Sequence, residues 1–123
     1  MSECRRLSLE LKMPLFNSSP HHLIEISALE GQKKVEQGAA LIDVRTAKEF
    51  ASGHVPGATN IPYDQIGRRI SEVSSEKERE IVLYCHLGQR ALVAQQTLSK
   101  LGYAAVFAAG GLDEWQALEH SES

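Results

Sequence analysis

The segment with the clearest chemical potential is 85–90, which reads Cys-His-Leu-Gly-Gln-Arg and places four residues between a cysteine and an arginine. It follows the apolar run 81–84 directly and precedes a stretch in which apolar residues recur at helical spacing. A thiol at such a strand-to-helix junction is exposed to loop N–H groups and to the partial positive charge of a helix N-terminus. Both favour the thiolate, so we predict that Cys85 is a reactive nucleophile.

Three other residues of this segment support the same interpretation. Gly88 permits the backbone conformations that a tight loop needs, and Arg90 offers a bidentate fork to an oxyanion. His86 lies beside the nucleophile, where it either tunes the charge of the thiol or is an ordinary loop histidine. The alternative is an inert cysteine packed as a small hydrophobic residue. The glycine and arginine that follow Cys85 argue against that alternative.

The surrounding elements alternate between apolar runs typical of buried strands and segments with helical spacing. Capping boxes at Ser27/Glu30 and Thr46/Glu49 predict two helices, the first reaching Gly38 and the second ending at Gly53. The predicted strands are 40–44, 81–84 and 104–108; the further helices are 66–73, 91–101 and 112–118; 56–62 is a loop, 74–80 a charged connection and 110–111 a turn. This order predicts an α/β fold, an open and mostly parallel sheet with helices on both faces. Ligands of such sheets bind outside the carboxyl ends of the strands, where Cys85 lies.

Composition limits the possible classes of protein. The chain has 123 residues, a mass of 13.5 kDa and 42% hydrophobic residues, enough for one domain with a core. A net charge of −3 and a pI of about 5.9 argue against nucleic-acid binding. The longest apolar run, 103–109, has 7 residues, whereas a membrane helix needs about 20. Cys4 and Cys85 are too few for a disulfide scaffold, which favours reduced thiols and a cytoplasmic location.

The chain divides into three parts on these grounds. Residues 1–22 are expected to be a flexible N-terminal extension, interrupted by Pro14 and Pro20 and without the apolar segment of a signal peptide. Residues 23–119 form the domain and 120–123 a short C-terminal tail. We expect no metal site, because adjacent pairs such as Cys85–His86 or His21–His22 rarely chelate one ion.

Several motifs together resemble the single-domain rhodanese family, whose members are thiosulfate sulfurtransferase-like. The motifs are 41–45 (Leu-Ile-Asp-Val-Arg), 49–50 (Glu-Phe), 53–58 (Gly-His-Val-Pro-Gly-Ala), 60–62 (Asn-Ile-Pro), 85–90 and 110–115 (Gly-Gly-Leu-Asp-Glu-Trp). The resemblance implies a five-stranded parallel sheet and a sulfurtransferase that needs no cofactor. It implies that Cys85 takes a sulfane sulfur from a small anionic donor such as thiosulfate, carries it as a persulfide, and passes it to a thiol, a protein acceptor or cyanide.

The same resemblance assigns roles to the residues around the nucleophile. The loop amides are expected to surround the persulfide, which makes the substrate-binding residues His86, Leu87, Gly88, Gln89 and Arg90. Four residues are expected to give structural support. Arg45 and Glu49 are spaced for an i,i+4 ion pair that braces the strand–helix junction together with Asp43, and His54 positions its turn.

Two other functions stay open. Phosphatases and arsenate reductases related to this fold resemble a Cys-x5-Arg pattern, one residue longer than here, and the shorter loop suits a sulfur atom. A non-enzymatic or relay module would keep the fold and carry sulfur for a partner on which it docks. The loop also lacks the basic second and third positions associated with thiosulfate-preferring two-domain enzymes, so the donor is not specified.

Overall fold

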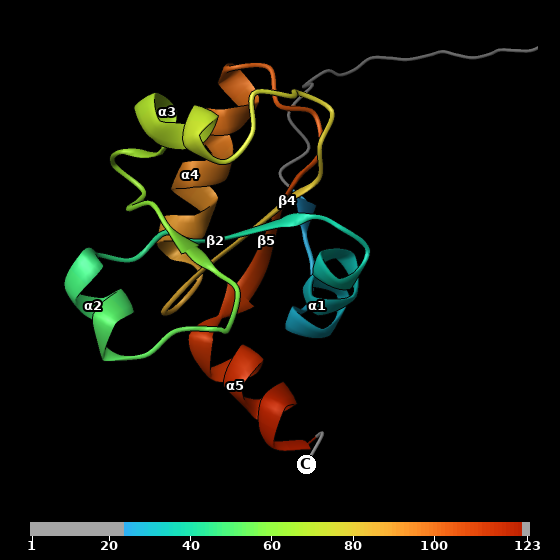
Figure 1. Ribbon diagram of the computed structural model, residues 1–123, viewed down its shortest axis with the longest axis vertical. Coiled ribbons are helices and arrows are strands. Elements are labelled where there is room, and N and C mark those ends of the chain that lie inside the picture. Colours follow the sequence, from blue (N-terminus) through green and yellow to red (C-terminus); the bar gives the residue numbers. More distant parts are fainter. Residues whose placement is uncertain (1–23, 122–123) are drawn as a thin grey trace, which may run out of the picture.

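Five parallel strands form the centre of the molecule, in the order β1-β5-β4-β2-β3 (Figure 1). The computed structural model describes residues 24–121, and the predictions made for residues 1–22, for Cys4 and for His21–His22 lie outside that range. The elements are β1 (Ile24–Glu25), α1 (Ala28–Glu36), β2 (Ala40–Asp43), α2 (Ala47–Ser52), β3 (Thr59–Asn60), α3 (Ile66–Arg69), the 3-10 helix η1 (Ile70–Glu72), β4 (Ile81–Cys85), α4 (Gln89–Lys100), β5 (Val106–Gly111) and α5 (Leu112–Ser121). The predicted α/β class is therefore confirmed.

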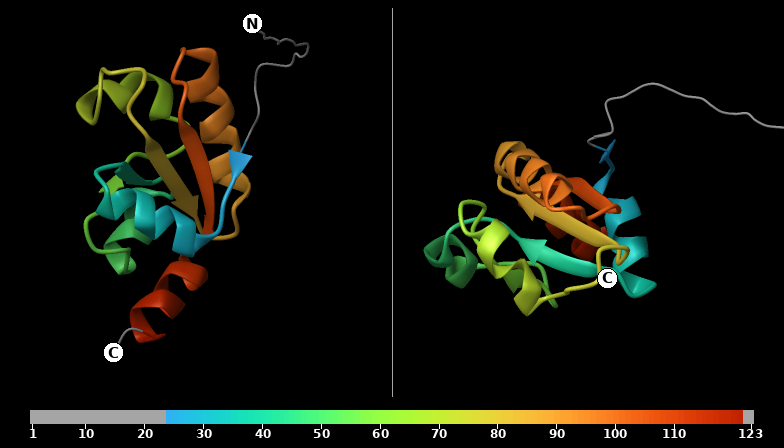
Figure 2. Two further views of the ribbon diagram at one scale, coloured as in Figure 1. Left: turned by 90° about the vertical axis from the view of Figure 1, so that its right-hand side faces the viewer. Right: turned by 90° about the horizontal axis from the view of Figure 1, so that it is seen from above.

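Helices cover both faces of the sheet, and the central strand shows why (Figure 2). Side chains alternate along β4, so that Ile81, Leu83 and Cys85 pack in the core under α3 and α4. Val82 and Tyr84 point to the opposite face and pack under α1 and α5. A strand buried on both sides reads as a continuous apolar run, as the sequence of β4 does.

The capping boxes begin α1 and α2 as predicted. The Ser27 and Thr46 side chains accept hydrogen bonds from the backbone N–H groups of Glu30 and Glu49, and each glutamate accepts the N–H of its cap residue in return. The helix predicted over 66–73 is interrupted, because α3 ends at Arg69 and gives way to the 3-10 turn η1. None of the helices within residues 24–121 has the length and apolar character needed to cross a membrane.

The prediction of a turn at Gly110–Gly111 is wrong, because both residues continue β5. Gly111 pairs with Cys85 across a register shift that begins at Leu83. A Cβ atom on Gly111 would collide with the carbonyl oxygen of His86, the residue that follows the cysteine. The glycine is thus required for the close approach of β5 to the Cys85 loop rather than for a change of chain direction. In addition, α5 continues to Ser121, into the segment expected to be a tail.

Gly31 provides a stability prediction in which packing opposes helix propensity. Propensity alone would make Gly31→Ala stabilising by about 1 kcal/mol. A Cβ atom at this position would lie 2.9 Å from both Ala109 Cβ and Trp115 Cζ2, closer than packed carbon atoms allow. We therefore expect the variant to lower the free energy of unfolding by about 1–3 kcal/mol in urea denaturation. Glu36→Ala, on an exposed position of the same helix, is the control and should change it by less than about 0.5 kcal/mol. A more stable Gly31→Ala variant would contradict the packing argument.

Candidate active site

Cys85 is the last residue of β4, at the carboxyl end of the sheet, and only 1% of its surface is exposed. Its Sγ accepts a hydrogen bond from the backbone N–H of Gly88 at 2.8 Å. Gly88 has a φ of +96°, in the left-handed region that favours glycine, and it is the N-cap residue of α4. The turn therefore directs an amide at the sulfur and begins the helix at the next residue.

A small pocket of about 90 Å³ opens at the sulfur. Its lining residues are Cys85, His86, Leu87, Gln89 and Arg90. Since one water takes about 30 Å³ of liquid volume, the pocket has room for a molecule of a few non-hydrogen atoms. Four of the five residues predicted to surround the substrate line this pocket, and the fifth, Gly88, donates its N–H to the sulfur. Leu87 is the most exposed of the large apolar residues described, at 77%, so it lies at the mouth of the pocket.

Arg90 joins the Cys85 loop to the beginning of α2. Its Nη1 and Nη2 bind the two carboxylate oxygens of Glu49 at 2.8 and 3.1 Å. The strands β4 and β2 are neighbours, and their connections run in opposite directions along the sheet. The pair therefore lies at the topological switch point, where open α/β sheets bind ligands. Because both Nη atoms are engaged by Glu49, Arg90 does not present the unoccupied fork that the sequence suggested.

The pairing of Glu49 corrects a second expectation. Arg45 and Glu49 were predicted to pair at i,i+4, but the Glu49 carboxylate binds Arg90, which is 41 residues away in the sequence. Hydrogen bonds from Arg90 and from the backbone of Thr46 lower the pKa of Glu49 to about 2. The same bond to Glu49 raises the pKa of Arg90. The two side chains are 29% and 37% exposed, so the pair contributes at most about 1 kcal/mol to stability.

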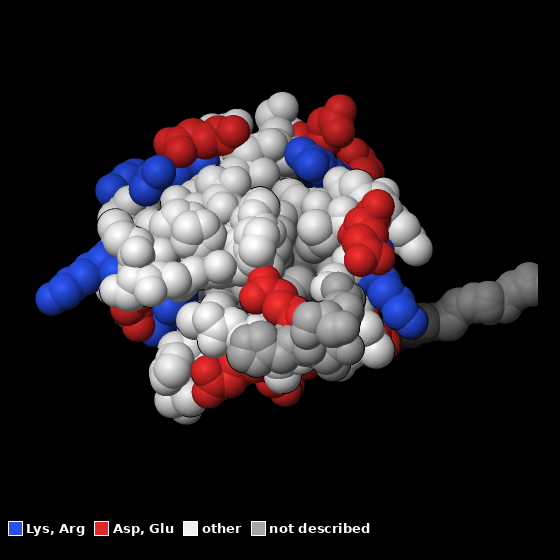
Figure 3. Space-filling view, turned by 60° about the horizontal axis from the view of Figure 1, so that its bottom comes forward, with Lys and Arg blue, Asp and Glu red and all other residues white. Residues whose placement is uncertain are grey.

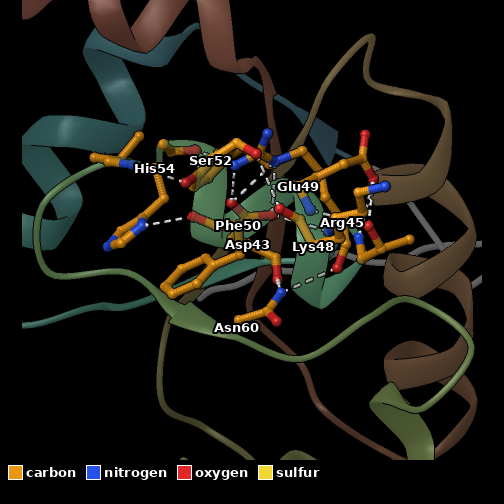
Figure 4. A network of polar contacts seen from close by, with 12 residues as sticks. Asp43, Arg45, Lys48, Glu49, Phe50, Ser52, His54 and Asn60 are labelled. Carbon is orange, nitrogen blue, oxygen red and sulfur yellow. Dashed lines mark hydrogen bonds and ion pairs between the residues drawn. The ribbon is translucent and has the colours of Figure 1, made fainter.

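Arg45 binds Asp43 instead, in a buried network that supports the site from below (Figure 4). The Asp43 carboxylate accepts the backbone N–H of Arg45 at 2.8 Å and its guanidinium at 2.7 to 3.0 Å. Arg45 Nη2 also donates to the carbonyl of Gly53, at the end of α2, at 2.6 Å. Burial alone would lower the pKa of Arg45, but the hydrogen bonds and charge of Asp43 outweigh it and the pKa is raised.

Asn60 and Tyr84 extend this network, and the sequence had not singled out either as a supporting residue. Asn60 Nδ2 donates to the carbonyl groups of Asp43 and Arg45, both at 3.0 Å, which ties β3 to the end of β2 (Figure 4). The Tyr84 hydroxyl accepts the N–H of Val55 at 2.9 Å. Burial raises the pKa of Tyr84, which keeps the hydroxyl neutral.

His54 lies away from the sulfur pocket, in the turn after α2. Its ring stacks on Phe50 with the ring centroids 3.7 Å apart, and Nδ1 lies 3.0 Å from the Phe50 carbonyl oxygen (Figure 4). These contacts hold the turn 53–58 against α2. Elsewhere within residues 24–121, no three His, Cys, Asp or Glu side chains are grouped so that they could hold a metal ion.

The fold is a parallel α/β sheet whose central strand ends in a cysteine, next to a loop amide and the start of a helix. The chain belongs to the rhodanese-like domain family, whose model matches residues 27–118. The resemblance seen in the sequence motifs is thereby confirmed, and so is the five-stranded parallel sheet that it implied.

Among curated proteins, the chain is 37% identical over 73 residues to thiosulfate sulfurtransferase PspE of Escherichia coli, covering 59% of this chain and 70% of that protein. It is 33% identical over 93 residues to a sulfurtransferase of Allochromatium vinosum, covering 75% of this chain and 85% of that protein. The solved structure of the human single-domain sulfurtransferase TSTD1 has a TM-score of 0.66 at 27% identity, covering 81% of this chain and 97% of that one. These relatives support a sulfurtransferase role.

Proposed function

We propose that this chain is a sulfurtransferase that moves a sulfane sulfur from a donor such as thiosulfate to a thiophilic acceptor through a persulfide on Cys85. The observation that carries the proposal is the bond from the Gly88 N–H to Cys85 Sγ at the base of a pocket of about 90 Å³. An amide fixed in this position stabilises the thiolate before reaction and the persulfide anion after it. The naming of PspE as a thiosulfate sulfurtransferase supports the choice of donor.

The chemistry needs one nucleophile and no general base once the thiolate exists. The Cys85 thiolate attacks the outer sulfur of thiosulfate, a new S–S bond forms to Sγ, the original S–S bond breaks, and sulfite leaves with that electron pair. Cyanide then attacks the outer sulfur of the persulfide, thiocyanate leaves, and the electron pair of the broken bond returns to Sγ. Because the reaction requires a reduced thiol, the proposal includes a reducing compartment such as the cytoplasm.

The test is a panel of sulfane donors read by intact-protein mass spectrometry. Thiosulfate, or another donor of the panel, should add one sulfur atom, about 32 Da, and cyanide should remove it and release thiocyanate. Cys85→Ser, which keeps a polar atom in the same place, should take up no sulfur and release no thiocyanate. If no donor loads the unmodified protein, or if the serine variant loads equally well, persulfide chemistry at Cys85 is wrong.

The phosphatase alternative has less support from the geometry. Thiosulfate and phosphate are both tetrahedral dianions, so the binding of Arg90 by Glu49 does not separate the two functions, whereas the loop from Cys85 to Arg90 is one residue shorter than the Cys-x5-Arg pattern. The shorter loop favours a site for one sulfur atom over a site for a phosphoryl group.

A further inference from the structure

A second and larger cleft, of about 500 Å³, adjoins the pocket at Cys85. It is formed by the carboxyl ends of β1 and β5, the starts of α4 and α5, and the loop after Cys85. Three loop residues, His86, Leu87 and Gln89, line both the cleft and the small pocket. A molecule in the cleft therefore lies against the same wall that encloses the sulfur.

The charged side chains that line this cleft are all acidic. Glu25, Asp113 and Glu114 line it, and no Lys or Arg of the described chain does. Glu25 and Asp113 have no ion-pair partner among residues 24–121. Glu114 is held in place, because its Oε1 accepts the N–H of Gly111 at 3.1 Å. Figure 3, which brings forward the end of the molecule that carries α5, shows acidic side chains near the middle of this face, and both acidic and basic side chains toward its margins.

The pocket and the cleft thus differ in size and in electrostatic character. The pocket is lined by Cys85, by Gln89 at the start of α4 and by Arg90, whose guanidinium is paired with Glu49, and the Gly88 N–H of the same loop donates to Cys85 Sγ, an arrangement that suits an anionic sulfur. The cleft is more than five times larger and carries carboxylates, which repel anions and attract cations over distances up to the Debye length, about 8 Å at physiological salt. A dianionic donor has no favourable site there. A sulfur acceptor with a positive charge does.

We propose that this cleft binds the sulfur acceptor and selects thiols that carry a positive charge close to the sulfur, the class of aminothiols. The inference rests on the proposed persulfide function and adds the acceptor class to it. The acceptor thiol, RSH, attacks the outer sulfur of the Cys85 persulfide and an S–S bond forms to the acceptor. The bond to Sγ breaks with its electron pair returning to Cys85, and the thiol proton ends on the new persulfide, so that RSH and Cys85–S–S⁻ become RSSH and Cys85–S⁻.

Three short thiols with the same spacing between sulfur and functional group test the selection. Cysteamine is a cation, 2-mercaptoethanol is neutral and 3-mercaptopropionate is an anion. Protein is loaded with sulfur, checked by mass, and mixed with each thiol at low salt while the loss of about 32 Da is followed. Each thiol is compared between the unmodified protein and the variant Glu25→Gln/Asp113→Asn, because this ratio cancels the thiol's own reactivity.

In the variant we expect the rate with cysteamine to fall about 3- to 10-fold, as two partly screened charge interactions would give. The rate with 2-mercaptoethanol should stay the same and the rate with 3-mercaptopropionate should rise. Added salt should reduce all of these differences. The matched control is Glu36→Gln/Glu78→Gln, which removes the same charge from two exposed positions outside the cleft and should leave all three rates unchanged.

Failure of this inference is distinct from failure of the proposed function. If no donor loads Cys85, the persulfide function is wrong, and the proposed acceptor class is wrong as well. If sulfur loads but the cleft variant changes the three thiols by the same factor, or changes none, the proposed function stands and acceptor selection by the cleft is wrong. An equal effect of the control variant would assign the selectivity to net charge and would also overturn the proposal.

Discussion

Replacing Arg45 by methionine is expected to lower the free energy of unfolding by about 3–5 kcal/mol, because it leaves the Asp43 carboxylate buried without its countercharge. Asp43 has no exposed surface, and its carboxylate takes three hydrogen bonds from the Arg45 guanidinium. The variant also loses the bond that ties β2 to the end of α2 through the Gly53 carbonyl. Urea denaturation at neutral pH measures the change, with the slope m checked for constancy.

The matched control for Arg45→Met is the same substitution at an exposed ion pair. Arg69 binds Glu72 at 3.2 Å with side chains 34% and 56% exposed, so Arg69→Met should change stability by less than about 1 kcal/mol. A second control, Asp43→Asn with Arg45→Met, removes the isolated charge and should recover part of the loss. Similar changes at Arg45 and Arg69 would show that burial of the Asp43–Arg45 pair has no special weight.

Inserting one glycine between Gly88 and Gln89 is expected to lower sulfur transfer about 10- to 150-fold, provided that the persulfide function holds. The insertion converts the loop to a Cys-x5-Arg pattern and moves α4 and Arg90 away from the sulfur. A charge-assisted hydrogen bond of the kind that Gly88 makes to Sγ is worth about 1.5–3 kcal/mol, which gives this range of rates. Single-turnover transfer from loaded Cys85 to cyanide measures the effect.

The control for the loop insertion is a glycine placed between Lys77 and Glu78, in the exposed connection before β4. This variant should keep the transfer rate of the unmodified protein. Hydrolysis of an aryl phosphate is measured in parallel, and the unmodified protein should show none. If it hydrolyses aryl phosphates readily and the insertion in the Cys85 loop leaves sulfur transfer untouched, loop length does not select between sulfur and phosphoryl chemistry.

The parts of the fold that the sequence predicted are those encoded locally. The capping boxes at Ser27 and Thr46 involve residues three positions apart, and the apolar runs of β2 and β4 are long enough to show a pattern. The strands β1 and β3 have two residues each, which is too short for any periodicity. Pairing with β5 and β2 creates them, and only the family resemblance implied a sheet of five strands.

In the candidate site too, features set by neighbouring residues could be predicted and contacts between distant segments could not. The position of Cys85 at the end of a strand follows from neighbouring residues and was predicted, and Gly88 was expected to permit a tight loop, which the structure forms with a left-handed glycine. The partner of Glu49 was not, because an i,i+4 spacing describes neighbours on one helix, whereas Arg45 precedes α2 and turns back to Asp43. The acidic cleft could not be predicted from the sequence either. Glu25 and Asp113 are 88 positions apart in the sequence, and only the pairing of β1 with β5 brings their segments together.

The ion pair between Glu49 and Arg90 has a consequence for how pH–rate profiles of this protein are to be assigned. With the pKa of Glu49 near 2 and the pKa of Arg90 raised by its bond to Glu49, neither group changes its protonation between about pH 5 and 9. The switch point therefore keeps a constant charge over that interval. Any limb of a profile measured there has to be assigned to the reacting thiols or to other titrating groups.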